Sequence, residues 1–256
     1  MSHEPRIRPN LTGTIAKTII GNIYYQEMSV LTPVPREART QSLLKAVPFF
    51  RLLDDDMLAD VAAKVITRRY QAGETIFWEG EPDAGLHLVA RGKCKVYRIS
   101  EQGREHVLAD LGPGDSCNEV PAVDGGPNPA NFMAVTDSTV WIISGEALNQ
   151  LRQQHPHLNN LIINNLAMRC RQLVQRVYNL SFLSVTGRLA AFLLQQCDAE
   201  SGLSRRQWTQ DEIAAHLGTV REMVGRAFRE LQQAELIAID RHQIKILDWE
   251  GLEELT

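Results

Sequence analysis

The sequence predicts an α+β protein made of an N-terminal antiparallel β-roll, a long helix and a C-terminal winged helix-turn-helix. Short apolar runs separated by turn residues fill residues 70–143, and apolar residues then recur every three or four positions over residues 158–180. Two short helices joined by a glycine turn follow within residues 209–231. Because strands and helices bury side chains with different periods, these changes mark boundaries. The predicted parts are an extension (1–40), the β-roll (41–150), the long helix (151–184) and the winged helix-turn-helix (185–256).

Composition and charge restrict the class of protein. The chain has 256 residues, 44% of them hydrophobic and 23% charged, which is ordinary for a globular protein of more than one domain. It has no apolar run of about 18 residues and no signal-peptide pattern, so we expect a cytoplasmic protein without a membrane partner. The net charge of −4 argues against non-specific polyanion binding but allows a local basic surface. Four cysteines without a CxxC pair fit a reduced compartment: Cys94, Cys117, Cys170 and Cys197.

The first 69 residues carry the weakest signals. Residues 1–40 mix prolines with one apolar patch, and we expect a poorly ordered extension; a docking segment and a natural start at Met28 are the alternatives. The apolar spacing over residues 41–69 predicts two short helices. Consecutive acids from Asp54 to Asp56 suit the start of the second helix, because carboxylates accept hydrogen bonds from the free N–H groups there.

Residues 70–143 are typical of an antiparallel barrel or sandwich. Runs of strand length alternate with glycine- and proline-containing turns, such as residues 112–115 and 124–127. Many short strands at near-regular spacing indicate an all-β domain. The predicted strands are residues 75–78, 86–90, 93–99, 106–111, 131–135 and 139–143.

The long helix has two apolar stripes. A helix with two such stripes buries one against its own chain and the other against a second surface. A core helix of a large domain is one interpretation, but a long helix leaving a β-domain favours a dimer seam. The first stripe contains Leu158, Ile162, Leu166, Cys170, Leu173, Val177 and Leu180, and the second contains Ile163, Ala167 and Val174.

The helix-turn-helix is predicted from spacing. Thr209 and Glu212 form a capping box, in which each side chain bonds the other residue's backbone N–H. Ala214 is small enough for a close helix crossing, Gly218 ends the helix with a left-handed backbone, and Val224 points back from the second helix. The order Ala-x3-Gly-x5-Val therefore predicts two helices joined by a tight turn.

The outward face of the second helix has the chemistry of a major-groove reader. Arg221 and Arg226 can bond guanine, Glu222 can accept from cytosine N4, and Gly225 permits close approach; Arg229 lies on the same face. The alternative is a solvated face on which Glu222 pairs with Arg226. The turn spacing favours the DNA interpretation. The opposite face contains Val220, Val224, Ala227, Phe228 and Leu231.

A β-hairpin is predicted over residues 238–246. Its polar tip would form a wing beside the recognition helix. Arg241 and Lys245 are the candidate phosphate contacts, which position a protein on DNA without reading sequence.

Two segments carry a resemblance to the CRP/FNR (cAMP receptor protein and fumarate-nitrate reduction) superfamily of transcription regulators. They are GETIFWEGEPDAGLHLVARGKCKVYRISEQGREHVLADLGPGD in the β-roll and TQDEIAAHLGTVREMVGRAFRELQQAELI in the helix-turn-helix, and the resemblance covers roughly residues 45–250. It implies a homodimer on a palindromic operator, a β-roll similar to cyclic-nucleotide-binding domains, an effector that reorients the DNA-binding domains, and RNA polymerase as a partner if the protein is an activator. It also implies base reading by Arg221, Glu222 and Arg226, and a phosphate contact at Thr219.

The resemblance places candidate effector-binding residues in and after the loop that follows the fourth predicted strand. They are Gly114, Cys117, Glu119 and Asn131. Cyclic-nucleotide binders of the family hold the phosphate with an arginine and a hydroxyl, but Pro129 and Ala130 stand at those positions here. Without that cation we expect no cAMP binding. The clustered N-terminal cysteines of the family's iron–sulfur sensors are also missing, so we expect no such cluster.

The effector remains open at this point. Haem, another small molecule, a thiol switch and no effector at all are the alternatives; haem would use His87 or Cys117, although a lone His or Cys on a strand is more often structural. Two further functions compete: an effector-binding module whose C-terminal helices contact a protein, and a metal-containing β-barrel enzyme. We expect no enzyme, because the β-region has neither an HxH nor an HxxxE spacing and no nucleophile with a plausible base.

Overall fold

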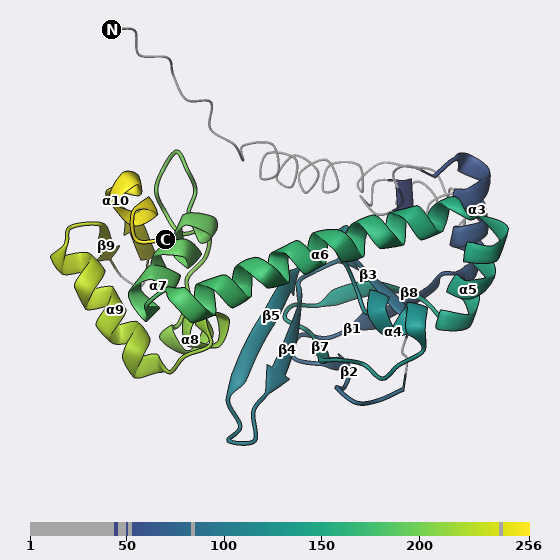
Figure 1. Ribbon diagram of the computed structural model, residues 1–256, viewed down its shortest axis with the longest axis horizontal. Helices are drawn as coiled ribbons and strands as arrows, with labels where there is room; N and C mark the ends of the chain where they lie inside the picture. Colours follow the sequence, from purple (N-terminus) through teal and green to yellow (C-terminus); the bar gives the residue numbers. More distant parts are fainter. Residues whose placement is uncertain (1–43, 46–49, 51–52, 83–84, 241–242) are drawn as a thin grey trace, which may run out of the picture.

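The predicted α+β class and order of parts are confirmed. Figure 1 shows a β-roll beneath a long helix, α6, and a smaller helical domain around the C-terminal end of that helix. The predicted extension (1–40) and most of the first predicted helix lie outside the described residues. The computed structural model describes residues 44–45, 50, 53–82, 85–240 and 243–256.

The β-roll consists of two four-stranded antiparallel sheets. In β3, Leu86 and Leu88 face the helices, while His87 and Val89 face the other sheet, so the strand is buried on both sides. One sheet has the order β1 (Ile66–Tyr70), β8 (Ser138–Ile143), β3 (Leu86–Arg91) and β6 (Ser116–Cys117). The other has the order β2 (Thr75–Phe77), β7 (Asn131–Ala134), β4 (Cys94–Ile99) and β5 (Glu105–Leu111).

The prediction that the second short helix continues to residue 69 is wrong, because the helix ends before that residue. Helix α3 (Asp55–Lys64) starts as expected, with Asp54 accepting a hydrogen bond from the Met57 N–H at 2.8 Å. It stops at Val65, and the chain continues as β1, with Ile66 opposite Ile142 of β8. Val65, Ile66 and Thr67 are all β-branched, which favours extended backbone over helix.

Two helices link the β-roll to the C-terminal domain, whereas the short α4 (Glu119–Asp124) lies within the roll, between β6 and β7. The first linking helix, α5 (Gly145–Gln154), starts at Ser144, whose hydroxyl caps the Ala147 N–H. The chain breaks at His155 because Pro156 follows, and α6 (His157–Phe182) then runs for 26 residues. Residues 151–154 of the predicted range 151–184 therefore belong to α5.

Helix α6 contacts the β-roll through only part of its surface. Leu158 and Ile162 are buried among the roll and its helices. Beyond them the helix exposes several large apolar side chains: Ile163, Met168, Leu173, Val174, Val177, Tyr178, Leu180 and Phe182. Within the described residues, no helix combines the length and hydropathy that a membrane span requires.

The C-terminal domain has its own core. It contains α7 (Val185–Gln196), α8 (Gln210–Leu217), α9 (Arg221–Gln233), β9 (Ile237–Asp240), β10 (Gln243–Ile246) and α10 (Trp249–Glu253). The core side chains come from all of these elements and include Leu189, Ile213, Val224, Phe228, Ile237, Ile244 and Leu252.

Candidate DNA interface and effector region

Helix α8 begins with the predicted capping box. The Thr209 hydroxyl accepts from the Glu212 N–H at 3.2 Å, and the Glu212 carboxylate accepts from the Thr209 N–H at 2.8 Å. Burial raises the pKa of Glu212, but the hydrogen bonds from Thr209 and Arg206 lower this pKa by more than burial raises it, so the net shift is downward. The carboxylate therefore stays ionised and holds the start of the helix-turn-helix.

Gly218 makes the turn for two separate reasons. Its backbone is left-handed, at φ 63° and ψ 44°, which confirms the predicted helix end. A Cβ at this position would also lie 3.1 Å from the His106 ring of β5. The turn is thus both a backbone requirement and a point where the helix-turn-helix touches the β-roll.

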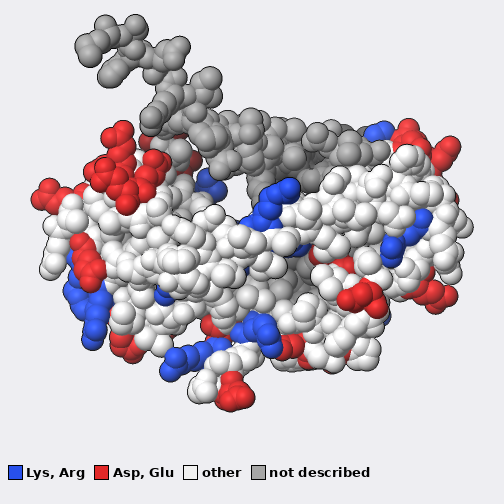
Figure 2. Space-filling model, in the orientation of Figure 1, with Lys and Arg blue, Asp and Glu red and all other residues white. Residues whose placement is uncertain are grey.

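The two faces of α9 divide as predicted. Val224, Ala227, Phe228 and Leu231 are buried. Arg221, Glu222, Arg226 and Arg229 are exposed, and Thr219 in the preceding turn is half-buried. Figure 2 shows basic side chains on the α9 side of the domain and acidic side chains around α10. The domain therefore presents its positive charge on the face that α9 occupies.

The arginines of α9 are largely free to meet a ligand. Arg221 pairs with Asp211 at 3.4 Å, but both side chains are exposed, and such pairs contribute about 0–1 kcal/mol. Among the described residues, Arg226 and Arg229 form no ion pair, and the alternative pairing of Glu222 with Arg226 is absent. A Cβ at position 225 would lie 3.4 Å from the Gln210 side-chain amide oxygen of α8, which is an ordinary van der Waals distance, so helix packing does not by itself require glycine there.

The predicted hairpin is present as β9 and β10. The strands pair antiparallel, with Gln243 opposite Asp240, and Lys245 is exposed. The tip residue Arg241, a predicted phosphate contact, lies outside the described residues.

The predicted effector residues lie around one loop but have different partners. Gly114 has a left-handed backbone (φ 90°) and donates to the Val89 carbonyl at 2.9 Å. The buried Asn131 side chain accepts from the Glu79 N–H at 2.9 Å. Both contacts hold the loop itself.

Glu119 is the most heavily bonded of these residues. It is 4% exposed, and one of its carboxylate oxygens accepts from the Ser116 hydroxyl at 2.6 Å and from the Asn165 amide at 3.0 Å. The Arg169 guanidinium lies 3.3 Å from the same oxygen and also donates to the Ser116 carbonyl. The loop thus receives a cation from α6, about 50 residues away in sequence.

The sequence analysis missed Arg169. Its only sequence signal is a positive charge immediately before Cys170 in an apolar stripe. The Arg169 Nε is buried without a hydrogen-bond partner among the described residues. Within the part of the chain that the structure describes, the hydrogen bonds of the side chain come from one terminal nitrogen, Nη2, which reaches both Ser116 and Glu119.

His87 and Cys117 are adjacent across β3 and β6. Burial lowers the pKa of His87 to about 4, and its Nδ1 lies 2.9 Å from the Gly85 carbonyl. Its ring packs against Phe77 and Phe132, at centroid distances of 5.0 and 5.9 Å. Burial raises the pKa of the Cys117 thiol. Haem ligation by either side chain would require this packing to open, so the residues fit a structural role better.

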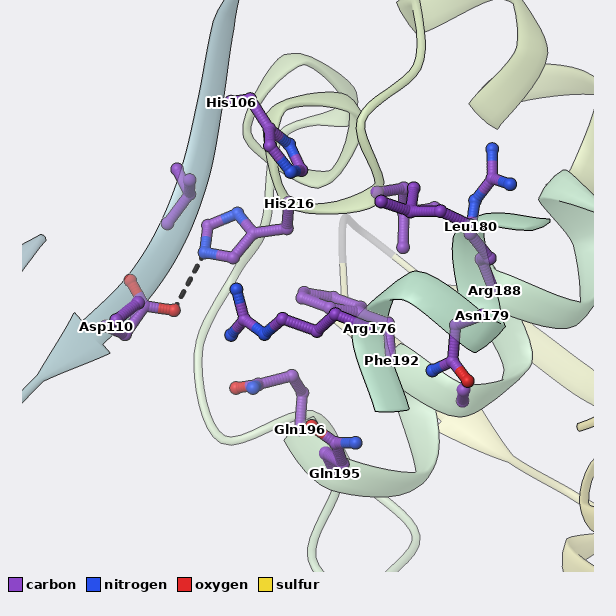
Figure 3. A pocket seen from close by; sticks show the side chains of 14 residues that line it. His106, Asp110, Arg176, Asn179, Leu180, Arg188, Phe192, Gln195, Gln196 and His216 are labelled. Atoms are coloured by element: carbon purple, nitrogen blue, oxygen red, sulfur yellow. Dashed lines mark hydrogen bonds and ion pairs between the residues drawn. The ribbon is translucent and has the colours of Figure 1, made fainter. Parts of the chain in front are cut away.

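The C-terminal domain and the β-roll meet in a cleft of ≈ 180 Å³ that both polar and apolar side chains line (Figure 3). His216 of α8 lies 2.8 Å from the Asp110 carboxylate of β5, and His106 of β5 lies 2.9 Å from the Ala215 carbonyl. Arg176 of α6 reaches across and donates to a carbonyl of β5. No prediction from sequence included this contact.

Comparison with known proteins agrees with this arrangement. Residues 67–155 match the cyclic nucleotide-binding domain family, and residues 187–255 match the Crp-like helix-turn-helix domain. The chain is 30% identical over 215 residues to the cyclic AMP receptor protein of Thermus thermophilus, covering 83% of this chain and 98% of that protein. It is 28% identical over 216 residues to a CRP-like cAMP-activated global transcriptional regulator of Mycobacterium tuberculosis, covering 82% and 96%.

A solved structure shows the same fold. A putative CRP/FNR-family transcriptional regulator of Eubacterium rectale aligns with a TM-score of 0.65 at 26% identity, covering 81% of this chain and 97% of that one. These relatives are regulators rather than enzymes, as the sequence predicted. With a cyclic-nucleotide-binding-like β-roll, a long helix and a Crp-like helix-turn-helix in that order, the chain belongs to the CRP/FNR superfamily of DNA-binding transcription regulators.

Proposed function

We propose that the protein binds a palindromic operator sequence-specifically, as a cytoplasmic homodimer, with one α9 in each half-site. The observation that carries this proposal is the exposed Arg221, Glu222 and Arg226 on a helix whose other face is buried. Bidentate contacts of arginine with guanine in the major groove discriminate bases by about 1–3 kcal/mol each. Thr219, Arg229 and the wing residues Arg241 and Lys245 would add phosphate contacts.

A fluorescence-anisotropy titration tests the DNA interface. The probe is a duplex selected from random sequence by the wild-type protein. Arg226→Ala is expected to weaken binding about 10- to 100-fold, the equivalent of one lost base contact. Arg91→Ala, an exposed arginine on β3, is the matched control and should leave affinity unchanged. Equal affinity of the two variants, or binding that does not fall with salt, would favour a protein partner for α9.

The occupant of the exposed α6 face is proposed to be a second copy of this chain. Exposed apolar side chains occur along much of the 26-residue helix, and among them Ile163, Val174 and Val177 are 11 and 3 residues apart, so they lie on one side of the helix, as a two-helix seam requires. Two-fold symmetry would also give two recognition helices, and each would meet one half-site.

Native mass spectrometry tests this assembly and reports any retained ligand. The expected mass is twice the 28.8 kDa of the chain. Val177→Asp, which places a charge in the seam, should yield monomer and abolish operator binding. Gln175→Asp, a polar position on the same turn of α6, serves as the control and should remain dimeric. A wild-type monomer would contradict the proposal.

The sensor domain is proposed not to bind cAMP, although the similar regulator of Mycobacterium tuberculosis is described as cAMP-activated. Pro129 and Ala130 provide neither charge nor hydroxyl, and Arg169 is already paired with Glu119. An effector of another class, if one exists, would bind near Gly114, Cys117, Glu119 and Asn131. Calorimetric titration with cAMP should release no heat of binding, and saturable binding would overturn this part.

A further inference from the structure

The two contacts between β5 and α8 make different demands on their histidines (Figure 3). His216 has both ring nitrogens in use: Nδ1 lies 2.7 Å from the Glu212 carbonyl oxygen and Nε2 lies 2.8 Å from the Asp110 carboxylate. His106 has one contact, from Nδ1 to the Ala215 carbonyl oxygen at 2.9 Å.

The protonation state of His216 follows from its partners. A carbonyl oxygen and an ionised carboxylate only accept hydrogen bonds, and a neutral imidazole has a single N–H to donate. Both contacts of His216 are therefore satisfied only when both ring nitrogens carry protons. His106 can make its single contact as a neutral ring. The two histidines thus differ in whether their contact depends on pH.

The surroundings of His216 place one anion among several cations. The ring is enclosed by Phe192 and Trp208, at centroid distances of 5.6 and 5.1 Å. Burial lowers the pKa of Arg176, and Asp110 opposes that shift, so this arginine also stabilises the Asp110 carboxylate. The charged and titratable groups that line the cleft are His106 and Asp110 on β5, Arg176 on α6, Arg188 on α7 and His216 itself on α8. The Glu212 carboxylate of α8 is paired with Arg206, in the loop before that helix.

We propose that His216 and Asp110 form a pH-dependent latch, which holds the DNA-binding domain against the β-roll when the imidazole is protonated and releases it as the pH rises. The latch would set the position of α9 relative to α6. Helix α9 packs on α7, α8 and β9 of its own domain, so the latched form leaves its arginine face open. The latched form is therefore expected to be the form that binds DNA, because its recognition helix is already positioned.

Imidazole nitrogen NMR on the full-length protein tests the latch without DNA. At the lowest pH at which the protein stays folded, both His216 nitrogens should carry protons if the latch is closed, and at high pH one of these protons should be lost. The protection factors of amides in β5 and α8, which are corrected for the base-catalysed intrinsic exchange rate, should then fall. In Asp110→Asn the side-chain amide can donate to an unprotonated Nε2, so these protection factors should stay high at both pH values. The latch is refuted if the protection factors of Asp110→Asn fall as those of the wild type do, or if the wild-type protection factors do not change when His216 loses its proton.

Operator affinity provides the second measurement, and this arm depends on the proposed function. At constant salt the wild type is expected to bind about three- to tenfold more weakly at the higher pH, since domain positioning is lost. Asp110→Asn should change less than about twofold, and Asp110→Ala should bind weakly at both pH values. An identical pH response in the wild type and Asp110→Asn would overturn the latch. If the wild type binds no DNA, the proposed function fails, and the NMR measurement alone decides the latch.

Discussion

Two ion pairs of nearly equal length occupy opposite ends of the molecule. Arg169 and Glu119 lie 3.3 Å apart in the effector region, with side-chain exposures of 29% and 5%. Arg221 and Asp211 lie 3.4 Å apart at the candidate DNA interface, with exposures of 63% and 69%. In the buried pair, loss of one partner leaves a charge with little water, whereas water replaces a partner in the exposed pair. We therefore expect charge changes to alter stability in the effector region and DNA affinity on α9.

The largest expected effect is acid destabilisation through His87 in the β-roll. Its pKa is lowered to about 4 in the folded protein, whereas an unfolded histidine titrates near 6.5. The part of the unfolding free energy that depends on a neutral His87 is thus fully present above about pH 6.5 and is lost as the pH falls toward 4. It amounts to about 3 kcal/mol. Urea unfolding between these pH values measures it.

His87→Gln is the variant that isolates this effect. Glutamine does not titrate, so the fall in unfolding free energy between about pH 6.5 and 4 should shrink by most of the 3 kcal/mol. A wild type and a variant with parallel pH profiles would show that His87 is not buried as the structure places it.

The second effect compares buried and exposed carboxylates directly. Glu119→Gln keeps the shape but removes the charge opposite Arg169, and we expect a loss of about 2 kcal/mol in unfolding free energy, less than for a fully buried pair because Arg169 is partly exposed. Glu79→Gln, which breaks the more exposed pair with Arg98, should cost less than about 0.5 kcal/mol. Equal losses would remove the distinction between the two environments.

The third effect concerns the point where the two regions touch. Gly218→Ala adds a methyl group to a left-handed residue, at a cost of about 1–2 kcal/mol, and presses it against His106. Gly103 has a similar backbone (φ 76°) but open space around it, so Gly103→Ala should lose only the stability that the left-handed backbone costs. Thermal unfolding of both variants should show a greater loss for Gly218→Ala. If the losses match, the turn does not contact β5 in solution.

The smallest effect is expected at the exposed pair. Asp211→Asn removes a negative charge beside Arg221 and should leave stability within about 0.5 kcal/mol of the wild type. Operator affinity should rise about twofold, because Arg221 no longer has a competing partner and one repulsion of phosphate is removed. Anisotropy at two salt concentrations measures this change. Weaker binding by the variant would mean that Asp211 positions Arg221 for DNA.

The DNA-binding end was predictable because its signals are local. The capping box joins Thr209 to a residue three positions away, Gly218 terminates its own helix, and the two faces of α9 follow from a period of 3.6 residues. The six predicted strands of the β-roll were also located to within one residue by their turns, whereas the two-residue β6 was not predicted. The strand over Ile66–Tyr70 was missed because its pairing with β8 outweighs the helical spacing of that segment.

The sequence by itself determined the order of parts and the helix-turn-helix with its arginine face. Only the tertiary structure decided that Arg169 reaches Glu119 and that His216 meets Asp110. These partners lie 50 and 106 residues apart. Periodicity and capping depend on hydrogen bonds within a turn of helix, whereas such distant pairs exist only after sheets and helices have packed and brought the charges together.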